Sequence, residues 1–331
     1  MSGTGDIVKD TSTFGAELTT PWPRDRLELS FAVGQDAERR WCCLRAAHHP
    51  GNRNPNQFTG RLATMNVPTL IINHADVQRM LLTQKSIAEA SLSLAMECNK
   101  LYDQVHATEG DEKEQYLLLL ELLTPIVKTY ASEQGSRSAA LAIQTLGGYG
   151  FTTDFPVQQL YRDIKIMSLY EGTTGIQSLD LLGRKVTMQN GKAVKLLAAT
   201  IMETIEAAKP YAELQPYSYK LAQELQRMSK VLTTLSSFAL KGDVERYLSD
   251  ATVFMEMASM IVIAWQWLKM SVVACSKIVA SDYTSNNQDF YKGKIHCMEF
   301  YFKYELPHAE ACAKTLEDEH TLTNIKSFDM F

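Results

Sequence analysis

The chain has 331 residues, of which 45% are apolar and 21% are charged, and its formal net charge is −5. This apolar fraction is typical of a packed protein and excludes wholesale disorder, while the length allows two domains. The mildly acidic balance, 33 Lys and Arg against 38 Asp and Glu, lacks the basic clustering of a dedicated nucleic-acid surface.

The first 66 residues differ from the rest, because they show no sustained helical or strand period and are rich in proline. We expect a weakly ordered leader here, with one short helix over residues 35–47. The opening MSGTGDIVKD has neither the basic nor the apolar segment of a secretory signal. We therefore expect a cytoplasmic protein, or a mitochondrial-matrix protein if the source is eukaryotic.

Helical patterning begins at about Asn73, where apolar residues start to recur at spacings of three and four. Pro125 predicts a new turn or a kink, and Gly147–Gly148 predicts a helix stop. Helices are expected over about 73–101, 112–123, 127–146, 156–167, 173–182, 191–208, 214–240, 244–281 and 288–317. No useful strand alternation follows residue 73, so the predicted fold class is all-α, built from helical bundles.

The most apolar stretch is MASMIVIAWQWL, residues 257–268, which raises the question of a membrane span. Twelve helical residues reach about 18 Å, which is short of the roughly 30 Å hydrocarbon core of a bilayer. We expect a buried core helix and no membrane span.

Six cysteines, at positions 42, 43, 98, 275, 297 and 312, show no paired CxxC spacing, and no histidines have metal-ligand spacing. This pattern is typical of small buried residues in a reducing compartment, so we expect no metal site.

The segment GGYG, residues 147–150, allows two interpretations. Missing side chains at a helix end let a backbone approach a bulky ligand closely, whereas a plain helix cap and turn uses the same residues. The segment YEGTTGIQ, residues 170–177, is similarly open. Glu171 precedes a helix start, where it can serve as a base beside backbone N–H donors, or can merely cap the helix with Thr173.

Longer motifs carry a resemblance to a known family. QTLGGYGF, PVQQLYRDIK and YEGTTGIQ, in this order and spacing, resemble the C-terminal helical domain of the acyl-CoA dehydrogenases. KGDVERYLSDATVFMEM, VIAWQWLKM and DFYKGKIHCMEFYFKYELP resemble the extra C-terminal domain of a subgroup that includes the 3-methylmercaptopropionyl-CoA dehydrogenases. The resemblance implies a four-helix-bundle domain at 67–186 and a second helical bundle at 187–331, after an unmatched leader at 1–66. Trp265, Trp267 and the run FYKGK at 290–294 are expected to serve the helical core rather than nucleic-acid binding.

The resemblance also implies an activity, which is the desaturation of an acyl-CoA thioester with FAD as cofactor. Glu171 is then the base that removes the α-proton, its backbone N–H helps hold the thioester oxygen, and Tyr170 and Gly172 contact the substrate. An electron-accepting flavoprotein is implied as a partner. The implied FAD-binding residues are Gln144, Thr145, Leu146, Gly147, Gly148, Thr173, Thr174 and Gln177.

Family members place an N-terminal helical domain and a middle β-domain before this part, and residues 1–66 resemble neither. Two hypotheses follow. The chain is the C-terminal half of an acyl-CoA dehydrogenase, acting as a homo-oligomer or with a partner chain that supplies the missing domains. Alternatively, it is a non-catalytic helical interaction protein of the same ancestry.

Overall fold

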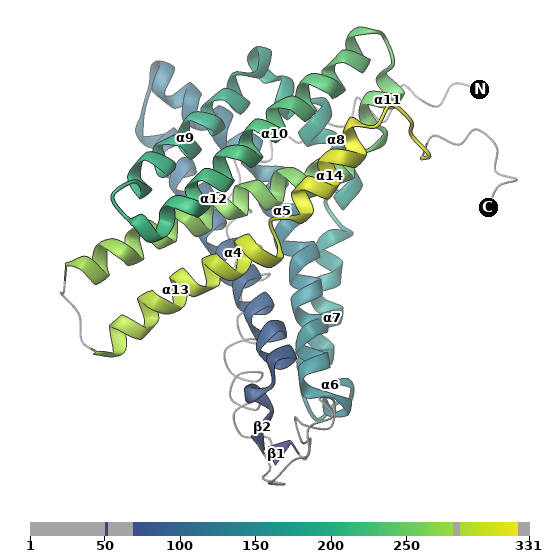
Figure 1. The fold of residues 1–331 in the computed structure, drawn as a ribbon. Helices are drawn as coiled ribbons and strands as arrows, with labels where there is room; N and C mark the ends of the chain where they lie inside the picture. Colours follow the sequence, from purple (N-terminus) through teal and green to yellow (C-terminus); the bar gives the residue numbers. More distant parts are fainter. Residues whose placement is uncertain (1–49, 52–68, 281–284, 324–331) are drawn as a thin grey trace, which may run out of the picture.

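The computed structural model describes residues 50–51, 69–280 and 285–323 (Figure 1). The helix expected over residues 35–47 lies outside these ranges. The described chain is helical, which confirms the predicted all-α class. Its one extended feature is a two-residue antiparallel pair, β1 (Pro50–Gly51) and β2 (Thr69–Leu70), after which the short turn η4 (Ile71–Asn73) leads into the first long helix.

Two long helices, α4 (Ala75–Ala107) and α5 (Gly110–Leu146), form a hairpin at the start of the bundle. The sequence predicted a new turn or a kink at Pro125, between helices over 112–123 and 127–146. The division into two helices is wrong, because α5 runs through the proline. The residues around it, Leu122, Leu123, Ile126 and Val127, are all buried. Their burial stabilises the helix by more than the missing proline hydrogen bond weakens it.

Four short elements follow α5: α6 (Gly148–Phe151), α7 (Val157–Lys165), η5 (Ile166–Ser168) and α8 (Thr174–Gly183). Helix α7 packs against α5, and in Figure 1 it lies beside the lower part of that helix, with α6 at the far end. Gly135 permits this close approach, because a Cβ there would lie 2.4 Å from Cδ1 of Ile164.

The second half of the described chain contains eight further helical elements. They are η6 (Lys185–Gly191), α9 (Lys192–Ala208), η7 (Ala212–Leu214), α10 (Gln215–Leu240), α11 (Val244–Ser249), α12 (Ala251–Val279), α13 (Ser285–Tyr304) and α14 (His308–Glu317). The helices predicted at 244–281 and 288–317 are each two helices. One break falls at Asp250, whose carboxylate pairs with the buried Arg246 at 3.0 Å, and the other falls before α14, at Pro307.

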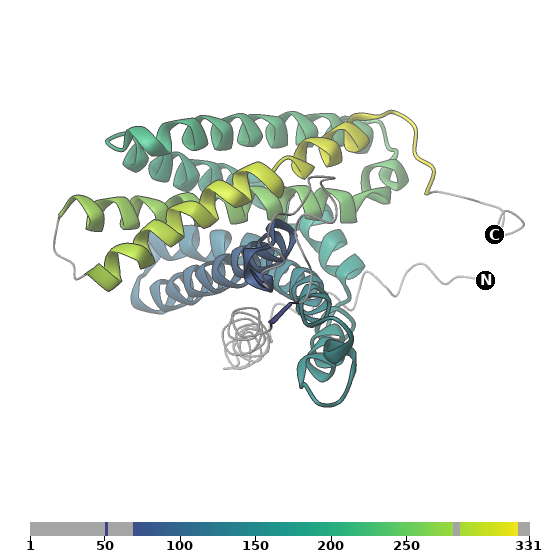
Figure 2. The same cartoon turned by 60° about the horizontal axis from the view of Figure 1, so that its bottom comes forward.

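Helix α12 is the centre of the fold and packs against α4, α8, α9, α10, α13 and α14. Figures 1 and 2 both show α13 returning alongside it. Trp265 and Trp267 are fully buried on α12, which excludes a nucleic-acid role for these two side chains. The indole of Trp265 donates to the Thr204 hydroxyl at 2.8 Å, and that of Trp267 donates to the Ser86 carbonyl at 3.2 Å. One hydrophobic core therefore includes residues from both halves of the described chain.

The same helix is 29 residues long, and by length and composition it could cross a membrane. The sequence argument considered only the twelve residues 257–268, which are part of this longer helix. However, 72% of its most apolar window is buried inside the protein, which supports the interpretation as a core helix.

None of the four cysteines in the described ranges forms a disulfide. Cys98 and Cys275 are buried, and burial raises the pKa of each thiol to about 12. Such thiols stay protonated at neutral pH and pack as small apolar groups, as predicted. Cys42 and Cys43 lie outside the described residues.

Candidate functional site

The turn between η5 and α8 has an unusual backbone. Glu171 has a φ of 51° and Gly172 has a φ of 89°, so two consecutive residues lie in the left-handed region. For a residue with a Cβ this conformation costs about 1–3 kcal/mol, and such strain persists only where the surroundings hold it. The Glu171 side chain is exposed at the surface of the described chain. The strained residue is therefore the one that carries the candidate base.

Two neighbours complete the turn. Thr173 is the N-cap of α8, with its hydroxyl oxygen accepting from the Ile176 N–H at 3.4 Å, so the capping role suggested for this threonine is confirmed. Gln177 packs over Gly172, because a Cβ on that glycine would lie 2.4 Å from Gln177 Nε2. The N–H groups of the first turn of α8 have no partners within the helix, which makes this end favourable for negative charge.

Helix α5 supports the turn from beneath with two charged side chains. The Lys128 ammonium donates to the carbonyl oxygens of Tyr170, at 3.4 Å, and of Gly172. Glu133 accepts from the Thr174 hydroxyl at 2.5 Å, and its other oxygen lies 3.3 Å from Lys165 Nζ. Burial lowers the pKa of Lys128, although the Glu133 and Glu171 carboxylates act in the opposite direction.

Sequence reasoning missed Lys128 and Glu133. The signal that points to them is their isolation, because they are the two charged residues between positions 122 and 136 of a helix whose neighbouring positions are largely buried. A charge in such a stretch needs a partner, and here the partners lie in the turn.

The glycines of GGYG have three different roles. Gly147 ends α5 with a φ of 63°, which favours glycine. Gly150 lies against α5, because a Cβ there would lie 2.5 Å from the Ile143 carbonyl oxygen. Gly148 has no heavy atom within 4 Å of the position a Cβ would take. The fold therefore requires Gly147 and Gly150, whereas Gly148 leaves an open surface that a ligand backbone or ring could approach.

These differences predict that alanine substitutions at Gly148 and Gly150 affect the stability of the fold unequally. Gly148→Ala should change the free energy of unfolding by less than about 0.5 kcal/mol, because the methyl group enters open space. Gly150→Ala should destabilise by about 1–3 kcal/mol, because the methyl group meets backbone that cannot rotate away. Urea unfolding followed by circular dichroism measures both, and equal effects would contradict this assignment of roles.

The implied FAD-binding residues form two separate groups. Thr173, Thr174 and Gln177 lie at the start of α8, where Thr174 contacts Glu133 of α5. The second group lies at the C-terminal end of α5, roughly 17 Å along the helix from Glu133. It consists of Gln144, Thr145, Leu146, Gly147 and Gly148. Figure 1 shows the same separation, with α8 beside the main bundle and α6 at the far end of α7. One chain therefore does not bring the two groups together.

Several of these side chains are already engaged within the fold. Thr145 is buried, and its hydroxyl donates to the Leu141 carbonyl at 2.8 Å. Tyr170 is half-buried and its hydroxyl lies 3.3 Å from the Met167 sulfur. Gln144 is exposed in the last turn of α5. Gln144 and the glycines after it are therefore the better placed residues of the second group for contacting a cofactor.

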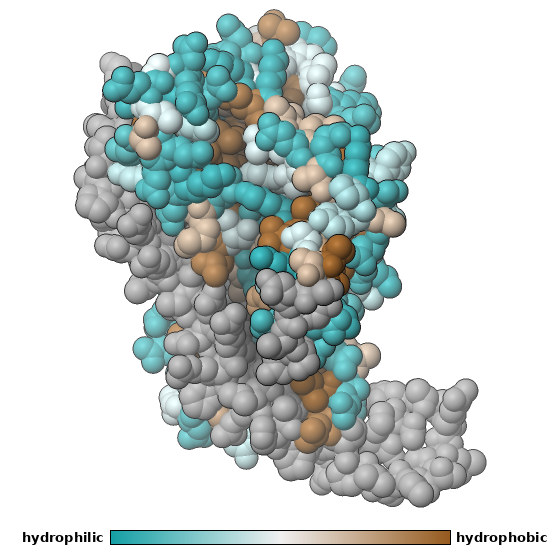
Figure 3. Space-filling model, turned by 90° about the vertical axis from the view of Figure 1, so that its left-hand side faces the viewer, coloured by the Kyte–Doolittle hydropathy of each residue, from teal (hydrophilic) through white to brown (hydrophobic). Residues whose placement is uncertain are grey.

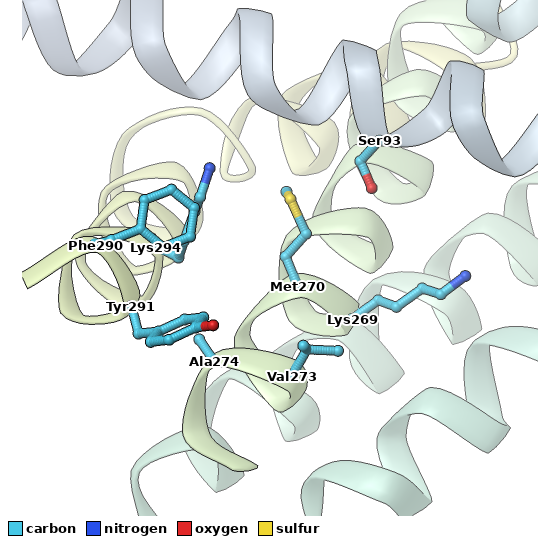
Figure 4. A pocket seen from close by; sticks show the side chains of 8 residues that line it. All are labelled: Ser93, Lys269, Met270, Val273, Ala274, Phe290, Tyr291 and Lys294. Atoms are coloured by element: carbon cyan, nitrogen blue, oxygen red, sulfur yellow. The ribbon is translucent and has the colours of Figure 1, made fainter. Parts of the chain in front are cut away.

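A cavity of about 280 Å³ lies elsewhere, between α4, α12 and α13 (Figure 4). Its wall is largely apolar and is formed by Met270, Val273, Ala274, Phe290 and Tyr291. Figure 3 faces this end of the molecule and shows apolar patches among the hydrophilic surface residues. The two ammonium groups that line it are paired, Lys269 with Glu97 and Lys294 with Glu89 at 2.9 Å. No predicted site residue lines this cavity, so it is separate from the candidate site.

Comparison with family models gives two matches in succession. Residues 61–186 match the model described as acyl-CoA dehydrogenase, C-terminal domain, and residues 197–324 match the model described as acetyl-CoA dehydrogenase C-terminal like. The first match includes both Glu171 and GGYG, and the second includes α12.

Two curated relatives show the same similarity. The broad-specificity linear acyl-CoA dehydrogenase FadE5 of Mycobacterium tuberculosis is 30% identical over 254 residues, which are 75% of this chain and 41% of that protein. The 3-methylmercaptopropionyl-CoA dehydrogenase of Ruegeria pomeroyi is 30% identical over 242 residues, which are 73% of this chain and 40% of that protein. The chain thus spans about two fifths of the length of these relatives.

A solved structure supports the fold. An acyl-CoA dehydrogenase from Bacillus anthracis, complexed with FAD, superposes with a TM-score of 0.63 at 17% identity, covering 88% of this chain and 48% of that one. The resemblance drawn from the motifs, including that to the 3-methylmercaptopropionyl-CoA dehydrogenase subgroup, is confirmed. Through its matched C-terminal helical part, the chain belongs to the acyl-CoA dehydrogenase family.

Proposed function

We propose that the chain is the C-terminal half of an FAD-dependent acyl-CoA dehydrogenase and that Glu171 is its catalytic base. The observation that carries this proposal is the turn at Glu171. The backbone of Glu171 is left-handed, and the residue lies two positions before Thr173, the N-cap of α8. A base beside backbone N–H donors is the arrangement needed to remove a proton next to a carbonyl group, since the carbonyl oxygen gains negative charge as the proton leaves.

In this proposal each part of the turn has a role. The Glu171 carboxylate accepts the α-proton of the acyl-CoA, and the backbone N–H of Glu171 donates to the thioester oxygen. Gly172 and Tyr170 border the reacting carbons. FAD, when bound, supplies the acceptor for the hydride that leaves the β-carbon.

Two observations support FAD as the cofactor of the assembled protein. Gly148 leaves open space at the surface beside the exposed Gln144, and a solved structure with a similar fold is complexed with FAD. The residues therefore fit the cofactor as two partial sites, one at each end of the α5 segment between Glu133 and Gln144. We infer that two copies of the chain, or this chain and a partner, complete each cofactor site between them.

The exposed apolar surface around both partial cofactor sites also supports the presence of a partner that covers it. Large apolar side chains are exposed along α6, α7, η5 and α8, where a folded monomer gains nothing from leaving them in water. They are Tyr149, Phe151, Tyr161, Ile166, Leu169, Ile176 and Leu179. The other domains of the family, or a second copy, would remove this surface from solvent.

Flavin uptake tests the proposal. The purified chain is titrated with FAD, alone and with a separately produced polypeptide that carries the remaining domains of the family, and a straight-chain acyl-CoA is then added without oxygen. We expect FAD to bind in the second arm and its absorbance to bleach when the acyl-CoA is added. If neither arm binds FAD, the alternative of a non-catalytic helical interaction protein replaces this proposal.

A further inference from the structure

Lys128 is placed to control the conformation of the Glu171 turn. It projects from the middle of α5, is half-buried, and its ammonium group reaches the carbonyl oxygens of Tyr170 and Gly172. These two carbonyls are the ones on either side of Glu171. A single cation therefore holds the peptide group directly before Glu171 and the peptide group directly after Gly172.

Because the peptide group is rigid, the contact with Lys128 also sets the direction in which the neighbouring N–H groups point. All peptide bonds in the described ranges are trans. In a trans peptide the C=O and the following N–H point in opposite directions. Because the carbonyls of Tyr170 and Gly172 both point toward Lys128, the N–H groups of Glu171 and Thr173 point away from it.

The hydrogen bonds also account for the persistence of the strain. A charge-assisted hydrogen bond in a partly buried place is among the stronger hydrogen bonds in proteins, and its stabilisation is comparable to the cost of a left-handed glutamate. Glu133, five residues further along α5, adds a second support by accepting from the Thr174 hydroxyl at 2.5 Å. The turn and the first residue of α8 are thus both held by α5.

We propose that Lys128 is a positioning residue: by binding the carbonyls of Tyr170 and Gly172, it holds Glu171 and its backbone N–H in the orientation that proton abstraction requires. The catalytic half of this inference rests on the proposed function of Glu171. The structural half, that Lys128 holds the turn, stands on the contacts alone.

Three variants separate these roles. Lys128→Met keeps the length of the side chain but removes its charge and its N–H donors. Lys128→Arg keeps both, and so serves as the conservative rescue. Lys165→Met is the matched control, because it removes a positive charge that also faces Glu133 but does not touch either carbonyl.

Hydrogen exchange on the purified chain tests the structural half without any flavin. In Lys128→Met, the two hydrogen-bonded amides at the ends of the turn, those of Tyr170 and Gln177, should exchange at least about tenfold faster, the factor expected for losing one charge-assisted hydrogen bond. Exchange in α12 should stay unchanged, and Lys128→Arg and Lys165→Met should match the unsubstituted chain. If Lys128→Met does not fold by circular dichroism, Lys128→Gln replaces it and is judged by the same criterion. Unchanged exchange of the Tyr170 and Gln177 amides in a folded variant would overturn the inference.

Flavin reduction in the assembled protein tests the catalytic half. Lys128→Met should lower kcat at least about tenfold with KM changed less than twofold, and Lys128→Arg should restore most of the loss. Faster exchange with an unchanged kcat would overturn the positioning role and leave Lys128 purely structural. If the unsubstituted assembly shows no flavin reduction while exchange still responds to Lys128→Met, the proposed function fails and the support of the turn by Lys128 holds.

Discussion

Glu171→Gln is expected to lower the rate of acyl-CoA-dependent flavin reduction by about 10²- to 10⁴-fold, the usual contribution of a positioned general base. The amide has the size and shape of the carboxylate but cannot take up the α-proton. Because the side chain is exposed and makes no part of the core, the fold should not change. Stopped-flow absorbance of the assembled protein under anaerobic conditions measures the rate directly.

Asp163→Asn is the matched control for that substitution. Asp163 is an exposed carboxylate on α7, and its replacement removes the same charge without touching the turn. Its rate should stay within twofold of the unsubstituted protein. If Glu171→Gln retains a comparable rate, the base is a different group and the proposed role of the turn is wrong.

Trp267→Ala should destabilise the chain by about 3–5 kcal/mol, the range for truncating a fully buried aromatic side chain. The indole is 0% exposed and donates to the Ser86 carbonyl of α4 at 3.2 Å. Truncation opens a large cavity where α12 meets α4. Domains of this size are stable by only about 5–15 kcal/mol, so the substitution removes a fifth or more of the total stability. Urea unfolding, followed by circular dichroism, measures the loss.

The matched control is Leu240→Ala, because Leu240 is 89% exposed at the end of α10 and should change stability by less than about 0.5 kcal/mol. The unfolding curve carries a second result. Since one core joins α4 and α5 to α12, a single transition is expected. Two separate transitions, with Trp267→Ala shifting only one, would mean that the segments 67–186 and 187–331 unfold independently, as the predicted domain division suggests.

Much of the fold could be predicted because it depends on local pattern. The spacing of apolar residues placed α9 and α10 within one or two residues of their observed bounds. The errors occurred where distant residues decide. Pro125 does not break α5, because the side chains around it are buried by other helices, and the break at Asp250 accompanies a buried ion pair with Arg246. Neither partner surface is visible in a local window of sequence.

The candidate site likewise has some features that local sequence predicts and others that depend on distant residues. Thr173 as a cap, and Glu171 immediately before a helix, follow from residue types and their order. The left-handed backbone at Glu171 and the hydrogen bonds from Lys128 to the carbonyls of Tyr170 and Gly172 do not, because these bonds join residues more than forty positions apart. The distance between the two partial cofactor sites likewise required knowing that Thr174 contacts Glu133, which places the first group on α5.

Because α5 is one continuous helix, its length fixes where the two partial cofactor sites lie relative to each other. Each residue of an α-helix advances about 1.5 Å and rotates about 100°, so the number of residues between Glu133 and Gln144 sets both the spacing and the relative direction of the two partial sites. Inserting one residue there would leave the composition, the charge and the helix nearly the same, yet would swing Gly147 and Gly148 to a different side of the helix. In this stretch, therefore, length is constrained as well as identity. A substitution at an exposed position such as Ala140 should be tolerated where an insertion or deletion is not.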